Sequence, residues 1–196
     1  TSILPTFMEG YDPSIQQVAY DPTAAAEALK AAGVTNVHII AYTNPRPYNT
    51  ATGQTLAEAV QGYLAKVGVT ATIDSYDWTT YKEKIKGGDY DICFYGWIGD
   101  NGDPDNFMYL LAHEDPTMNV ARYQNPEFNR LIEEGVKTQA GPERNKIYTE
   151  LEKIAAADAV WLPISHAQTL AAYRPEVQNF LYHVTGVTPF AKVSKQ

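Results

Sequence analysis

Residues 90–107 read YDICFYGWIGDNGDPDNF, and the change of composition at Gly96 decides how the fold is interpreted. The first part, Tyr90–Tyr95, is rich in aromatic and branched residues and predicts a buried strand. The second part, Gly96–Asn106, holds three aspartates, two asparagines and three glycines, a composition typical of a loop. Because ligands of α/β proteins usually bind at the carboxyl ends of strands, this acidic loop is a candidate site.

Upstream of the acidic loop, strand patterns alternate with helix patterns. Short β-rich runs are separated by segments whose apolar residues recur at helical spacing. The strands are expected at 37–42, 69–75 and 90–95, and the helices between them at 56–67 and 77–87. This order favours right-handed crossovers and a mixed, mainly parallel sheet flanked by helices, which is an α/β fold.

The rest of the chain adds further elements to the same domain. Asp21-Pro22 predicts the start of an alanine-rich helix, and Gly33 predicts its end. After the acidic loop we expect amphipathic helices at 126–138 and 142–157, then strands at 160–164 and 169–173. The proline at 163 indicates an edge strand or a bulge. One α/β domain, preceded by an extended lead-in, is the simplest organisation.

The bulk composition excludes some classes of protein. A chain of 196 residues can bury one substantial core without disulfide or metal support. The net charge of −8 argues against nucleic acid or an anionic membrane as partner. No apolar run approaches the ~20 residues that span a bilayer. Thr1 is not followed by a signal-peptide pattern, so the chain is expected to be cytoplasmic, processed or cut from a longer protein.

The acidic loop has three interpretations. One of the carboxylates of Asp100, Asp103 and Asp105 can accept hydrogen bonds from a ligand ammonium, with Gly99 letting the backbone approach. Alternatively the residues only shape a turn, and Asp105 caps a helix that begins at Phe107. Calcium is the third interpretation, although the spacing misses the EF-hand pattern and its closing Glu.

A basic residue follows another predicted strand. Arg46 lies after the strand at 37–42, on a loop stiffened by two prolines, where its guanidinium can bind a carboxylate in bidentate fashion. A solvated surface arginine is the alternative. Paired with Asp100, Arg46 would suit a zwitterion with an ammonium at one end and a carboxylate at the other. Trp97 abuts the acidic loop and is expected to line a pocket.

The sequence offers little evidence of a catalytic site, and we expect neither catalysis nor a metal or cofactor. No nucleophile elbow, P-loop or dinucleotide-binding motif is present. Cys93 lies within a predicted strand and is interpreted as a small buried apolar residue. A hydrolase that uses Asp100 or Asp103 as base remains the enzymatic alternative, but it lacks a partner group. The histidines show no metal-ligand spacing: His38, His113, His166 and His183.

Residues 96–107 closely resemble the signature of dipeptide-binding proteins, in the oligopeptide/dipeptide/nickel solute-binding family of ABC importers. The similarity continues in order along nearly the whole chain, at residues 20–22, 46–49, 66–69, 123–132 and 162–166. The acidic loop is its most specific part. The resemblance implies one lobe of a Venus-flytrap binding protein of the periplasmic-binding-protein type 2 fold.

The resemblance also implies roles for individual residues. Arg46 would pair with the carboxylate of a short peptide and Asp100 with its free amino group, while Trp97 lies beside the site. Gly99, Asn101, Asp103 and Asp105 would support the loop. The protein would be extracytoplasmic, either periplasmic or a cell-surface lipoprotein, and would deliver peptides to an ABC permease. Haem, oligopeptides and nickel complexes are alternative ligands of the same scaffold.

Two departures from the family matter. Its full members are more than twice as long, so this chain corresponds to the C-terminal lobe and lacks the first lobe. Residues 1–20 would then lead in from the first lobe or hinge, 21–176 would form the second-lobe domain, and 177–196 would return to the first lobe. The isolated lobe is expected to bind weakly. A disulfide often found after the acidic loop is absent, because residues 110–123 contain no cysteine.

Overall fold

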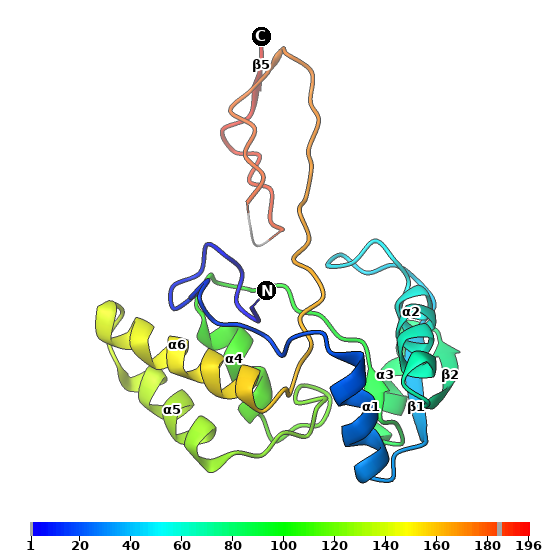
Figure 1. The fold of residues 1–196 in the computed structure, drawn as a ribbon. Helices are drawn as coiled ribbons and strands as arrows, with labels where there is room; N and C mark the ends of the chain where they lie inside the picture. The colour runs from blue at the N-terminus through cyan, green and yellow to red at the C-terminus, as the bar shows by residue number, and fades with distance from the viewer. Residues whose placement is uncertain (1, 184–185) are drawn as a thin grey trace.

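The computed structural model describes residues 2–183 and 186–196. Figure 1 shows two packed bodies side by side, each with its own hydrophobic core. The sheet body contains the parallel sheet with helices α2 and α3, and the helical body contains α4, α5 and α6. The chain crosses between the two bodies through the acidic loop, residues 96–106. The loop therefore lies where the bodies meet.

The sheet body is built on a three-stranded parallel sheet in the order β2-β1-β3. The central strand β1 (Asn36–Tyr42) pairs over its whole length with β2 (Thr70–Tyr76), and on its other side with β3 (Ile92–Cys93). Helices α2 (Gly53–Lys66) and α3 (Trp78–Gly87) connect the strands. The predicted strand–helix order and the α/β fold are confirmed.

The crossovers determine which loops become neighbours. Four consecutive residues of β1, 39–42, are buried, as in a strand covered on both faces. The chain moves outward to β2 and then back across β1 to β3, so right-handed crossovers place α2 and α3 on opposite faces. In a parallel sheet all carboxyl ends share one edge. The Arg46 loop, defined as residues 43–52, and the acidic loop therefore leave from the same edge.

Strand β3 is shorter than the strand predicted at 90–95. Beyond Cys93, the Tyr81 hydroxyl from α3 accepts a hydrogen bond from the Phe94 N–H (2.9 Å) and donates one to the Phe94 carbonyl (2.8 Å). A side chain thus satisfies the polar backbone groups that a neighbouring strand would otherwise bind. The ladder ends there, and the chain leaves the sheet towards the acidic loop.

The helical body consists of α4 (Asp105–Ala112), α5 (Pro126–Lys137) and α6 (Pro142–Ala157). The helices predicted at 126–138 and 142–157 are confirmed to within one residue. The Asn125 side chain begins α5 by accepting hydrogen bonds from two backbone N–H groups of the first turn. The core of this body joins buried residues of all three helices: Phe107, Met108, Leu111, Phe128, Leu131, Ile132, Tyr148, Leu151 and Ala155.

The N-terminal segment, defined as residues 2–12, packs onto the helical body. Its Leu4 and Met8 side chains are 0% and 6% exposed. The Thr149 hydroxyl donates to the Gly10 carbonyl (2.8 Å), and the Glu152 carboxylate accepts the N–H of Leu4 at 3.3 Å. The following residues 13–20 are largely exposed. Helix α1 (Pro22–Ala31) begins at its predicted cap, Asp21, and buries no residue.

Residues 160–173 run as extended chain without pairing to any described segment, so the strands predicted at 160–164 and 169–173 are wrong. A strand needs a neighbour for its backbone N–H and carbonyl groups, and no described segment forms a ladder with this one. The C-terminal arm, defined as residues 168–183 and 186–196, projects from the two bodies (Figure 1). It contains the short antiparallel pair β4 (Val177–Gln178) and β5 (Ser194–Lys195).

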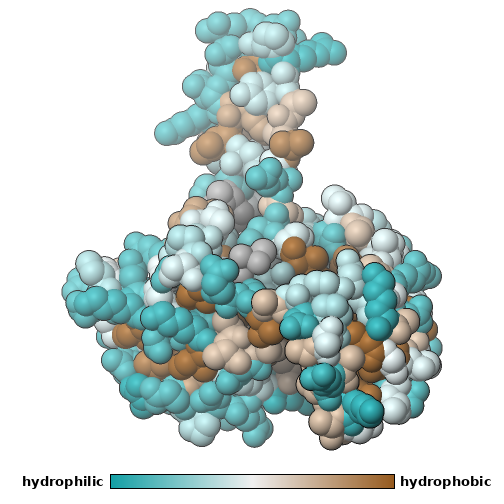
Figure 2. All heavy atoms as spheres, viewed as in Figure 1, coloured by the Kyte–Doolittle hydropathy of each residue, from teal (hydrophilic) through white to brown (hydrophobic). Residues whose placement is uncertain are grey.

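The arm carries apolar side chains on its surface. Leu170 is 91% exposed, and Val187 and Phe190 are each 66% exposed. Figure 2 shows apolar atoms on the projecting arm and between the two bodies, while the outer faces of the bodies are mostly hydrophilic. Among the described helices, none has the length and apolar character needed to cross a membrane.

Candidate ligand-binding site

The Arg46 loop holds its arginine by backbone turns and by stacking. The N–H of Arg46 donates to the Asn49 carbonyl and the N–H of Asn49 donates to the Arg46 carbonyl, both at 2.9 Å. The Arg46 guanidinium lies over the Trp78 ring, 3.8 Å from its centroid. Its Nε atom is buried without a hydrogen-bond partner among the described residues. The guanidinium is held by its face, which leaves its edge for an acceptor.

Trp78 is part of an aromatic cluster that the sequence did not identify as a site feature. It stacks on Tyr81 (5.7 Å between centroids) and on Tyr95 (6.3 Å), and Tyr42 contacts it edge-on (5.8 Å). Trp78 lies within the helix predicted at 77–87. It is the first residue of α3, directly after β2, and this position brings it to the edge of the sheet that carries Arg46.

The acidic loop is fixed largely by its own amide side chains. Asn106 Oδ1 accepts hydrogen bonds from Trp97 Nε1 (2.8 Å) and from the Asp100 N–H (3.1 Å). Asn101 Oδ1 accepts from the Asp103 N–H (3.0 Å). At Gly99, a Cβ would lie 2.7 Å from the Phe107 ring, so only glycine fits there without displacement. Asn106 is a central residue of the loop that sequence reasoning left without a role.

The inner half of the loop is bound to α6. Arg144, 7% exposed, donates from both terminal nitrogens to the Asp103 carboxylate at 2.9 and 3.0 Å. The Tyr148 hydroxyl donates to Asp105 Oδ1 (3.1 Å). Asp105 is the first residue of α4, and no described side chain caps this helix, so the interpretation of Asp105 as a helix cap is wrong. The Asp105 N–H donates instead to Asp103 Oδ1 (2.9 Å). Arg144 was not anticipated, because it lies 41 residues from Asp103.

The surroundings shift the pKa values of the two inner carboxylates in opposite directions. Partial burial pushes the pKa of Asp103 upward, but the Arg144 hydrogen bonds and the Asp105 N–H outweigh it, so the pKa is lowered overall. Burial raises the pKa of Asp105, and the Tyr148 hydrogen bond opposes this only in part. Both carboxylates are engaged by protein groups. The described residues contain no group of three or more metal-ligating side chains.

The environment of Asp100 differs from that of Asp103 and Asp105. Its side chain is exposed, and the described residues provide no hydrogen bond or ion pair for its carboxylate. Arg46 likewise forms no ion pair with a described residue. Among the charged side chains of the Arg46 loop and the acidic loop, the two predicted to bind a ligand therefore have no hydrogen bond or ion pair with a described residue, whereas Asp103 and Asp105 are both engaged.

The two loops touch each other through Tyr48. Its ring lies so close to Gly96 that a Cβ on that glycine would be 2.3 Å from Tyr48 Cδ2. The Tyr48 hydroxyl is buried without a hydrogen-bond partner among the described residues, and burial raises its pKa to about 12. The sheet edge thus brings the Arg46 loop and the start of the acidic loop into one site.

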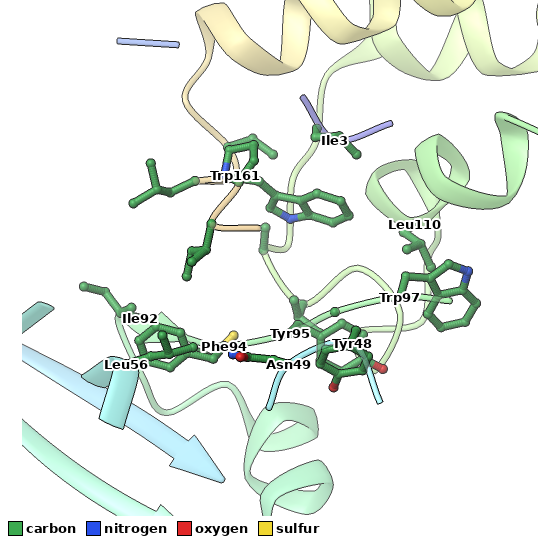
Figure 3. A pocket seen from close by; sticks show the side chains of 18 of the residues that line it. Ile3, Tyr48, Asn49, Leu56, Ile92, Phe94, Tyr95, Trp97, Leu110 and Trp161 are labelled. Atoms are coloured by element: carbon green, nitrogen blue, oxygen red, sulfur yellow. The ribbon is translucent and has the colours of Figure 1, made fainter. Parts of the chain in front are cut away.

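A cavity of about 620 Å³ lies beneath these loops. Figure 3 shows Tyr48 and Asn49 on one side, Trp97 and Leu110 on another, and Trp161 facing them across the space. The extended segment 159–167 lines the side with Trp161. The position predicted for Trp97, beside a pocket, agrees with this geometry. A parallel sheet with unpaired charged loops at its carboxyl edge, above a cavity of this size, defines an α/β ligand-binding protein.

The comparisons with known proteins assign the family. Residues 1–119 match the family described as bacterial extracellular solute-binding proteins, family 5 Middle. The chain belongs to this family of solute-binding proteins.

Curated relatives extend the match over almost the whole chain. Haem-binding protein A of Haemophilus influenzae is 32% identical over 201 residues, covering 97% of this chain and 36% of the relative. The dipeptide-binding protein of Escherichia coli K12 is 32% identical over 199 residues, covering 98% of this chain and 37% of the relative. The chain therefore spans little more than a third of these relatives.

Solved structures confirm the fold class. HbpA2 from Haemophilus parasuis has a TM-score of 0.89 at 27% identity, covering 100% of this chain and 39% of that one. The dipeptide-binding protein from Pseudoalteromonas sp. SM9913, solved in complex with Met-Leu, has a TM-score of 0.85 at 27% identity, with the same coverage. These neighbours are binding proteins of the Venus-flytrap type, and this chain has the fold of one of their lobes.

Proposed function

We propose that this chain is a lobe of an extracytoplasmic solute-binding protein that recognises short peptides by their charged termini. Asp100 binds the free ammonium and Arg46 binds the free carboxylate. Trp97 lies beside the peptide, and Gly99, Asn101, Asp103 and Asp105 shape the loop around Asp100. Dipeptides are the expected ligands.

One observation carries this proposal. Arg46 and Asp100 are on adjoining loops at one edge of the sheet, and both lack an ionic partner, whereas the neighbouring Asp103 is paired. An unpaired cation and an unpaired anion in one site complement a zwitterion. The names of the curated relatives support the choice of a peptide, because one is a dipeptide-binding protein and another a di/tripeptide-binding protein.

The site is incomplete within this chain. Exposed ion pairs contribute only about 0–1 kcal/mol, so strong binding requires a second surface that excludes water. The remaining two thirds of the parent protein would supply this surface as the first lobe, with closure around the ligand by hinge motion. The closed form would then deliver the peptide to an ABC permease, in the periplasm or at the cell surface as a lipoprotein.

Calorimetry with Met-Leu, its N-acetyl form and its amide tests the role of the termini. The free dipeptide is expected to bind the 196-residue chain more weakly than micromolar, yet about tenfold or more tighter than either blocked form. Arg46→Met should abolish the discrimination against the amide, and Asp100→Asn the discrimination against the N-acetyl form.

Matched controls are Arg174→Met and Asp89→Asn, which remove exposed charges outside both loops. Equal affinity for free and blocked peptides would overturn the proposal. Sub-micromolar affinity for the free peptide would contradict the view that this chain holds only half of the site.

Haem is the second candidate ligand, favoured by the 32% identity to haem-binding protein A and by the cavity with apolar walls. Titration of the chain with haem, followed by its Soret absorbance, tests it. If haem binds and the dipeptide neither binds nor competes, then haem replaces peptide as the ligand.

A further inference from the structure

The inner wall of the cavity is apolar. It lies below the two charged loops and is formed by side chains from α2, β3, α4 and the segment 159–167. Figure 3 shows several of them directed into the space. The apolar lining residues are Leu56, Val60, Ile92, Cys93, Phe94, Leu110, Val120 and Trp161.

Several polar groups on this wall are already satisfied by the protein. The Tyr90 hydroxyl donates to the Val120 carbonyl (2.7 Å), and the Tyr95 hydroxyl donates to the Thr117 carbonyl (3.2 Å). Arg122 donates to two carbonyls at the end of α3, both at 3.2 Å. These bonds engage the protons of both tyrosine hydroxyls and hold Arg122 Nη2 on backbone carbonyls.

Cys93 lies in the same apolar wall of the cavity. It lines the cavity, and burial raises the pKa of its thiol to about 11, because a thiolate would be poorly solvated there. Cys93 is also the only cysteine of the chain, which makes it a specific chemical probe of the cavity.

We propose that this cavity is a subsite for a bulky apolar side chain of the bound peptide. The inference rests on the proposed function and adds to it the class of side chain that is preferred. Tyr48, Asn49, Gly96 and Trp97 belong to the charged loops and also line the cavity, so the two parts of the site are continuous. The volume of about 620 Å³ is typical of ligand pockets and accommodates a leucine or phenylalanine side chain.

The first test compares dileucine with dialanine by calorimetry. Both peptides carry the same terminal charges, so any difference in affinity comes from the side chains. Burial of a leucine side chain predicts that dileucine binds about 10- to 100-fold tighter. Equal affinities would overturn the subsite while leaving recognition of the termini intact.

The second test follows alkylation of Cys93 by mass spectrometry. Saturating dileucine should slow the reaction severalfold, whereas dialanine at equal occupancy should slow it much less. If dileucine binds tighter but leaves the alkylation rate of Cys93 unchanged, the side chain is bound elsewhere and the proposal fails.

A filled cavity provides a third, structural test. Val60→Trp places an indole into the cavity from α2, and should remove the preference for dileucine while dialanine still binds. Val136→Trp is the matched control, because Val136 on α5 is 60% exposed and outside the cavity. An unchanged preference in folded Val60→Trp would overturn the subsite. If Val60→Trp does not fold, the alkylation result on the unmodified chain decides.

Two outcomes would instead concern the proposed function. If neither dipeptide binds, recognition of peptides fails and the subsite fails with it. If haem alone binds and protects Cys93, the cavity is a porphyrin site, and the side-chain subsite is overturned.

Discussion

The acidic loop has two halves that contain the same residue type and differ in what surrounds it. In the inner half, Asp103 is bound by both terminal nitrogens of Arg144, and Asp105 accepts a hydrogen bond from Tyr148. In the outer half, three residues before Asp103, the carboxylate of Asp100 is exposed and unpaired among the described residues. Contacts with α6 therefore distinguish the two carboxylates that hold the loop, Asp103 and Asp105, from Asp100, which we propose binds the ligand.

This comparison shows that the element packed beside a carboxylate determines its role. Removing one partner of a buried ion pair destabilises the fold, because the other charge is left without compensation. A carboxylate in solvent contributes little to stability and keeps its charge for an incoming cation. Predictions about the two halves should therefore separate into large effects on folding and effects on binding alone.

The largest effect is expected from Arg144→Met. This change removes four hydrogen bonds, to Asp103, Gly135 and Tyr148. Loss of one partner of a buried ion pair typically costs about 3–5 kcal/mol. Because the Asp103 side chain is 38% exposed and can turn to water, the lower end of that range is expected. The free energy of unfolding, from urea titration followed by circular dichroism, measures it.

Arg130→Met is the matched control for this prediction. Arg130 on α5 also pairs with two carboxylates, at 2.7 Å each, but its side chain is 56% exposed. Its loss should cost under about 1 kcal/mol. Equal costs for the two variants would contradict the assignment of the inner half to structure.

The next effect concerns Glu152, a buried carboxylate on α6 that binds the N-terminal segment. It is 3% exposed and accepts the N–H groups of Leu4 and Asp12, at 3.3 Å each. Burial raises its pKa from 4.5 to about 7. The folded state thus binds the proton more tightly than the unfolded state. Stability from this group is full below pH 4.5 and decreases by about 3 kcal/mol as pH rises through 7.

Glu152→Gln should flatten this dependence. A series of urea midpoints from pH 5 to pH 8 should decrease less steeply for the variant than for the unmodified chain, since the amide does not titrate. Glu150→Gln is the control, because Glu150 lies on the same helix and pairs with Lys153 in solvent. If Glu152→Gln and the unmodified chain show the same slope, Glu152 is not the titrating group.

Much of the fold was predictable because local patterns decide it. The strands and helices of residues 21–95 followed from apolar periodicity and from the predicted cap Asp21, which the structure confirms. The strand at 160–164 was predicted from composition and is wrong. Composition reports that Trp161-Leu162 suits a strand, but not whether a neighbouring strand is present to pair with it.

The site was predictable only in part, and for a related reason. Arg46 and Asp100 were identified because each follows a strand, and parallel strands bring their ends together. The stacking of Arg46 on Trp78 and the pairing of Asp103 with Arg144 join residues 32 and 41 positions apart. No spacing rule in a single sequence indicates such contacts, since they depend on how whole elements pack.

A smaller effect is expected where the two loops touch. Gly96→Ala would place a Cβ 2.3 Å from the Tyr48 ring, forcing the Arg46 loop away at a cost of about 1–3 kcal/mol. Gly62→Ala is the opposite case, because Gly62 lies within α2 with nothing within 4 Å of the added Cβ. That variant should gain about 0.5–1 kcal/mol from helix propensity. A neutral Gly96→Ala would show that the two loops are not packed against each other.

The smallest effect on folding is expected from Asp100→Asn, and it most sharply separates the two halves of the loop. The carboxylate of Asp100 has no partner among the described residues, and its backbone N–H still donates to Asn106 after the change. The free energy of unfolding should therefore stay within about 0.5 kcal/mol of the unmodified chain, whereas Asp103→Asn should weaken the bidentate pair with Arg144 and destabilise the chain measurably. Urea titration of both variants at one pH makes the comparison. Equal destabilisation would mean that Asp100 also holds the loop, which would remove the main reason for assigning it to the ligand.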